Sequence, residues 1–159
     1  PRWIEGRPAD RPTGEQVTRP SFAGVTEDGT TLTLTARRAR PDPQVEGRAM
    51  TEDLRGVANL PDGSEIRVAA RAGVFDEPAG EVRLSGGVQI ESSAGYRMTS
   101  EQLSVGLERL TMDSAGPVPG RGPAGRIDAG RLRVTGETEA AGAQLLFSDG
   151  VKLLYDPEG

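Results

Sequence analysis

The amino-acid sequence predicts an all-β domain, a jellyroll or β-taco in which two antiparallel sheets built from repeated hairpins face each other. Three observations support this fold class: apolar residues recur at every second position, turn signals separate these stretches, and one small motif recurs about every thirty residues. The chain has 159 residues, a length that suits one domain with a single apolar core.

Apolar side chains alternate with polar ones along most of the chain after residue 21. Alternation of this kind marks strands that bury one face and expose the other to water. The sheets are therefore expected to enclose one apolar surface, which we call the predicted inner face. It comprises Ile66, Val68, Val82, Leu84, Val88, Ile90, Tyr96, Met98, Leu103, Val105, Leu107, Leu132, Val134, Leu145, Phe147, Val151 and Leu153.

Three Asp-Gly pairs lie between the alternating stretches, at Asp28, Asp62 and Asp149. Gly adopts positive φ without a Cβ clash, so these pairs predict tight turns. Calcium-binding loops need several ligands at short fixed spacing, whereas these pairs lie 34 and 87 residues apart. The pairs are therefore interpreted as turns.

A short motif repeats with a small residue at its centre, at Ala36, Ala70, Ser100 and Ala129. The steps between these positions are 34, 30 and 29 residues. Such a period predicts stacked hairpins, each unable to bury its apolar face alone. The small residue would let the chain turn a corner between the two sheets.

Two stretches lack this periodicity. Residues 1–20 are rich in Pro and Arg and predict a flexible linker, which leaves residues 21–157 as the folded domain. Residues 113–125 are rich in Gly and Pro and predict a long exposed loop between Met112 and Ile127.

The residue inventory argues against catalysis. The chain has no His and no Cys, and Lys152 is its single Lys, so the usual general bases, thiolate nucleophiles and zinc ligands are missing. The stretch 120–125 fits G-x-G-x-x-G, but a dinucleotide site needs a helix after it, and here alternation resumes instead. No catalytic residue, metal site or cofactor is predicted, and the chain is not expected to be an enzyme.

The charge balance argues against nucleic acid as a partner. The net charge is −5, and no run of basic residues is longer than Arg37-Arg38. Proteins that bind the phosphate backbone need a basic footprint.

Several segments resemble a known family. Residues 19–29 (RPSFAGVTEDG), followed by 32–36, resemble the start of LptC-like periplasmic domains and look most like those of alphaproteobacteria. Residues 72–76 and 84–90 resemble the repeated A-x-x-G-x-Y…L-x-G-x-V hairpin of that family. Further family-like segments are 118–132 and 143–153, so that the resemblance spans about residues 19–156.

Two positions depart from the family pattern. Phe75 stands where the hairpin often has Tyr, and Gly87 stands where polar residues are common. Neither change conflicts with the fold, and the pair Gly86-Gly87 indicates a β-bulge.

The resemblance implies a twisted β-jellyroll with an apolar interior that binds lipopolysaccharide, but it identifies no single binding residue. The predicted inner face is the candidate lining of a groove for the acyl chains, although alternation alone is equally compatible with a closed core. It also implies a periplasmic domain tethered to the inner membrane by an N-terminal helix that this sequence lacks. Such a domain receives lipopolysaccharide from an inner-membrane ABC transporter complex. It passes the lipid to a periplasmic bridge protein of similar fold, and exposed strand edges are expected to pair with these partners.

Two other functions are compatible with the residues themselves. One is a carbohydrate- or peptidoglycan-binding β-sandwich, which the aromatic content of only 4% makes less suitable because sugar rings stack on aromatic platforms. The other is a structural β-solenoid segment of a surface protein. An upstream single-span helix would favour the lipid-binding interpretation over both.

Overall fold

The structure, a computed structural model, describes residues 3–5, 17–114, 116–136 and 143–155. The described part is all β, as predicted, and all of its strand pairs are antiparallel. No helix in it is long and apolar enough to cross a membrane. The strands are β1 (Trp3–Glu5), β2 (Val17–Thr18), β3 (Ser21–Val25), β4 (Thr31–Thr35), β5 (Arg38–Pro41), β6 (Arg48–Asn59), β7 (Glu65–Asp76), β8 (Glu81–Ser92), β9 (Arg97–Gly106), β10 (Thr111–Ser114), β11 (Val118–Gly122), β12 (Gly125–Ala129), β13 (Arg131–Gly136), β14 (Ala143–Ser148) and β15 (Lys152–Tyr155).

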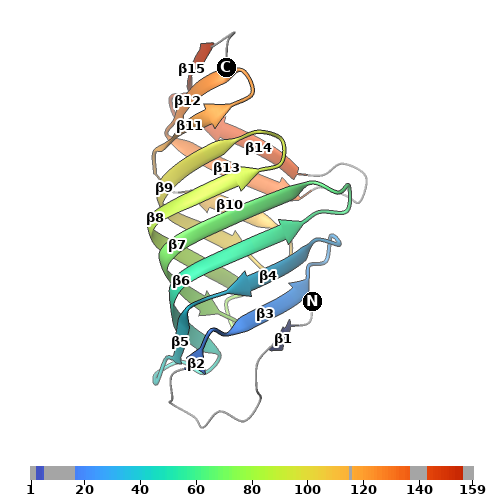
Figure 1. The fold of residues 1–159 in the computed structure, drawn as a ribbon, viewed down its shortest axis with the longest axis vertical. Helices are drawn as coiled ribbons and strands as arrows, with labels where there is room; N and C mark the ends of the chain where they lie inside the picture. Colours follow the sequence, from blue (N-terminus) through green and yellow to red (C-terminus); the bar gives the residue numbers. More distant parts are fainter. Residues whose placement is uncertain (1–2, 6–16, 115, 137–142, 156–159) are drawn as a thin grey trace.

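The strands form one large sheet that folds back on itself without closing into a barrel (Figure 1). Four long strands, β6 to β9, run in consecutive hairpins. The two halves of β6 pair with β4 and β5, and the two halves of β9 pair with β11 and β10. The first wall contains the halves of β6 to β9 nearest the β6–β7 and β8–β9 turns. Beyond β6 it continues with β4, β3 and β1, and beyond β9 it continues with β11, β12 and β15. The second wall comprises β2 and β5, the other halves of β6 to β9, and β10, β13 and β14.

The predicted corner residues lie where the chain passes from one wall to the other. Ala36 separates β4 from β5, and Ala129 ends β12 just before β13 begins. Ala70 and Ser100 lie inside β7 and β9, between the halves that belong to different walls. All four are buried, because a small side chain fits where the walls converge.

The central strands bend at β-bulges. The register between β7 and β8 shifts from Ala69 to Ala72, and that between β8 and β9 shifts from Ser85 to Val88. Gly86 and Gly87 have φ of 81° and 76°, which confirms the bulge predicted at this pair. The Gly residues of the three Asp-Gly pairs have φ from 87° to 92°, which confirms the predicted turns.

The prediction of a long loop at 113–125 is wrong. Most of this stretch forms strand: β10 ends at Ser114, and β11 and β12 form a hairpin around residues 123–124. Gly120 explains the difference, because a Cβ at this position would lie 2.4 Å from the carbonyl oxygen of Arg97. The Gly that looked like a loop signal therefore lets β11 approach β9 closely.

The structure describes only part of residues 1–20, for which the sequence predicts a flexible linker. Trp3–Glu5 pairs with β3, and Val17–Thr18 pairs with β5, so two short segments of this stretch are strands. Residues 1–2 and 6–16 lie outside the described part of the chain.

Candidate functional site

The space between the two walls holds one continuous apolar cluster. Most of the predicted inner face lies in it, with exposed fractions of 7% or less. Tyr96, Leu145 and Phe147 are half-buried and pack against it. The members that it buries are Ile66, Val68, Val82, Leu84, Val88, Ile90, Met98, Leu103, Val105, Leu107, Leu132 and Val134.

Val151 and Leu153 do not join this cluster, since they are 49% and 54% exposed. Val151 precedes β15 and lies outside any strand. Leu153 pairs with the buried Ile127 and therefore lies on the inner side of the first wall. Its exposure shows that the described second wall does not cover this end of the interior.

Several buried residues were missing from the predicted inner face. Leu32 and Leu34 belong to the alternating stretch of β4, so their signal was present in the sequence. Val118 is fully buried, but it lies in the stretch interpreted as a loop. Leu110 occupies a turn, where alternation gives no signal, and is also fully buried.

The central part of the interior is tightly packed. A cavity there has a volume of about 20 Å³ and is lined by apolar residues of both walls, among them Leu32, Val68, Leu84, Val105 and Met112. That volume accommodates about one water molecule, whereas small-molecule pockets measure about 300–1,000 Å³. This cavity is therefore too small to hold an acyl chain.

Polar and aromatic contacts between described residues join the walls directly. The turns 26–30 and 107–110 meet through a hydrogen bond in which the Glu27 backbone N–H donates to the Glu108 carbonyl oxygen over 2.7 Å. The side chains of Arg109 and Glu27 form an ion pair at the same place, 3.7 Å apart. We call this meeting of turns the mouth. Two aromatic pairs also join the walls, Phe22 with Phe75 at 5.0 Å and Tyr96 with Phe147 at 5.9 Å between ring centroids.

The first-wall side of the mouth contains polar groups that lack partners. Thr26 and Thr30 are buried, and the Thr30 N–H donates to the Thr26 hydroxyl oxygen over 3.0 Å. The Thr30 hydroxyl and one carboxylate oxygen of Asp28 are buried without a hydrogen bond. An unsatisfied buried polar group costs about 1–3 kcal/mol.

Ion pairs stabilise the outer faces of the walls. The Asp113 carboxylate accepts two hydrogen bonds from Arg131, at 2.7 and 3.0 Å, and these bonds hold the pKa of Asp113 below its ordinary value. Among the described residues, no group of three or more His, Cys, Asp or Glu is arranged to hold a metal ion.

Comparison with known proteins places this fold in a family. The chain matches the family model described as "Lipopolysaccharide-assembly, LptC-related" over residues 57–152, from the second half of β6 to the first residue of β15. The match covers β7 to β14 in full, and these strands contribute to both walls. No curated protein matches the chain. The chain therefore belongs to the LptC-related family of lipopolysaccharide-assembly proteins, and its role lies in lipopolysaccharide export.

Proposed function

We propose that this domain binds the acyl chains of lipopolysaccharide between its two walls and relays the lipid without performing chemistry on it. The observation that carries the proposal is the apolar cluster that runs between two walls not closed into a barrel. Burial of an acyl chain contributes about 0.8 kcal/mol per CH₂. A continuous aliphatic surface is therefore suited to shielding such a chain from water.

The relay requires partners at the ends of the sheet. Among the described strands, β14 pairs only with β13, and β15 pairs only with β12, so each offers one unpaired edge. Leu146, Leu153 and Leu154 are exposed beside these edges. An unpaired, apolar edge favours addition of a strand from another protein. We expect this end to receive the periplasmic bridge protein, and the inner-membrane ABC transporter complex to supply the lipid.

The proposed location is the periplasm, with tethering to the inner membrane by an N-terminal helix outside this sequence. Family membership supports it. A reporter enzyme active only outside the cytoplasm, fused to the natural full-length protein, tests it.

Site-specific photo-crosslinking tests the binding proposal. A photoreactive amino acid at Leu84 or Val105, both buried in the second wall, should label lipopolysaccharide. The neighbouring positions Arg83 and Ser104 lie on the outer face of the same strands and provide matched controls. Labelling of the outer positions without the inner ones would contradict the proposal.

A further inference from the structure

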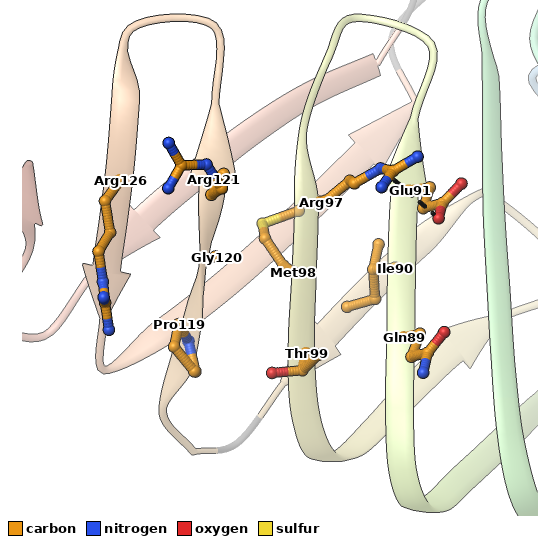
Figure 2. Close-up of a pocket in the computed structure, with 10 residues that line it drawn as sticks. All are labelled: Gln89, Ile90, Glu91, Arg97, Met98, Thr99, Pro119, Gly120, Arg121 and Arg126. Carbon is orange, nitrogen blue, oxygen red and sulfur yellow. Dashed lines mark ion pairs between the residues drawn. The ribbon is translucent and has the colours of Figure 1, made fainter. Parts of the chain in front are cut away.

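A groove of about 440 Å³, separate from the apolar interior, lies on the outer face of the first wall (Figure 2). Arginines line it from three neighbouring strands: Arg97 of β9, Arg121 of β11 and Arg126 of β12. Cross-strand pairing joins Arg97 with Arg121 and Arg121 with Arg126. Directly paired residues point to the same face, and all three side chains are exposed. We call these residues the arginine row.

The row concentrates positive charge on one part of an acidic chain. Three cations occupy adjacent strands of a chain whose net charge is −5. Two carboxylates lie beside the row. Glu91 lies 3.8 Å from Arg97, and Asp128 lies 3.5 Å from Arg126, in ion pairs that are largely exposed. Figure 2 shows Arg97 turned toward Glu91.

The row lies close to one end of the interior. Arg97 directly follows Tyr96, whose ring packs against Phe147 of the second wall. Arg121 and Arg126 flank the turn of the β11–β12 hairpin. β15 pairs with β12 at this same end, where the inner side of the first wall is uncovered at Leu153. A lipid with its chains between the walls would bring its headgroup out beside these turns.

We propose that the arginine row binds phosphate groups on the saccharide headgroup of the lipid whose acyl chains enter the interior. Planar guanidinium groups donate paired hydrogen bonds to phosphate, and the three arginines present such donors to one groove. Pro119 and Gly120 of β11 also line the groove. This inference rests on the proposed function, because the headgroup reaches the row only when the chains occupy the interior.

Binding of purified lipopolysaccharide to a triple variant tests the inference. Arg97→Gln, Arg121→Gln and Arg126→Gln together should weaken binding by about tenfold or more and flatten its salt dependence. The matched control, Arg38→Gln with Arg40→Gln and Arg83→Gln, removes the same charge from the outer face of the second wall. It should bind within about twofold of the parent domain. Dephosphorylated lipopolysaccharide should bind the parent domain, the triple variant and the control variant with equal affinity.

The outcomes separate the two proposals. If the triple variant and the parent bind intact lipopolysaccharide equally well, the proposed phosphate binding by the arginine row is overturned. The acyl-chain proposal is not affected by that result. If the parent binds deacylated, phosphorylated headgroup through the row but shows no added affinity for the acylated lipid, the acyl-chain proposal is overturned instead. Inorganic phosphate that competes as strongly as the deacylated headgroup, at equal phosphate concentration, would assign the row to free phosphate and overturn the headgroup assignment.

Discussion

At the residue scale, single side chains decide how closely the strands approach. Gly120 permits the contact between β11 and β9, and a Cβ there would also lie 2.6 Å from Cγ of Met98. The close contact between β9 and β11, which carry Arg97 and Arg121 of the arginine row, therefore depends on the absence of a side chain at Gly120. Gly116, a few residues earlier, has no atom within 4 Å of an added Cβ.

We expect Gly120→Ala to lower the free energy of unfolding by about 1–3 kcal/mol, because the backbone of Arg97 cannot move away cheaply. Gly116→Ala is the matched control and should change stability by less than about 0.5 kcal/mol. Urea denaturation followed by circular dichroism measures both. Equal effects of the two substitutions would show that β11 does not pack as described.

Asp113 gives the domain a pH dependence. Its pKa is lowered in the folded state, chiefly by the hydrogen bonds from Arg131. A lowered pKa means that the contribution is fully present above the unfolded value, about 3.9, and is lost as the pH falls through the folded value. We therefore expect the parent to lose stability below about pH 4 more steeply than Asp113→Asn does.

Urea midpoints measured between neutral and acidic pH give this comparison. Glu101→Gln serves as the control, since Glu101 is exposed and has no ion pair among the described residues. Parallel acid profiles for the parent and Asp113→Asn would contradict the assignment.

At the element scale, the alternating sequence pattern identified the strands whose faces are clearly divided. It succeeded for β7, β8 and β9, because their inner residues are aliphatic and their outer residues are polar. It failed for β11, where Pro119 and Gly120 replace the usual strand residues and long-range pairing with β9 determines the structure. It also could not give the arginine row, because the register between strands far apart in sequence brings those residues together.

The exposed end formed by β14 and β15 should be needed for handover to the bridge protein. We expect Leu146→Lys with Leu154→Lys to weaken binding of the purified bridge protein by about tenfold or more, since both side chains are exposed beside unpaired edges. Val25→Lys is the control, because Val25 is equally exposed on β3, toward the other end of the sheet. Biolayer interferometry measures the affinities. If only Val25→Lys weakens binding, the bridge protein docks at the opposite end.

At the scale of the whole molecule, the proposed lipid binding requires a route into the interior, and we expect it to open where the two turns of the mouth separate. The Glu27–Glu108 hydrogen bond places the two turns close enough for a disulfide between substituted cysteines. The sequence has no Cys, so an added pair meets no other thiol within the chain. We expect oxidised Glu27→Cys/Glu108→Cys to lose lipopolysaccharide labelling at Leu84 and to regain it on reduction.

The control pair for this experiment lies within one wall. The Ser93 N–H donates to the Glu65 carbonyl oxygen over 2.8 Å. Glu65 begins β7 and Ser93 follows β8, so both residues belong to the first wall. Oxidised Glu65→Cys/Ser93→Cys should be labelled like the parent. Full labelling of the oxidised Glu27→Cys/Glu108→Cys protein would show that lipid enters elsewhere than at the mouth.

The sharing of β6 to β9 between both walls has a consequence for folding. These strands follow one another as hairpins, so their pairing closes only short loops and costs the least chain entropy. The β12–β15 pair, in contrast, joins residues such as Ile127 and Leu153 across an intervening hairpin. The central hairpins are therefore the natural nucleus for folding, and the outer strands add to a template that already contains both walls. Neither wall is an independent unit, and loss of one removes the strands on which the other is built.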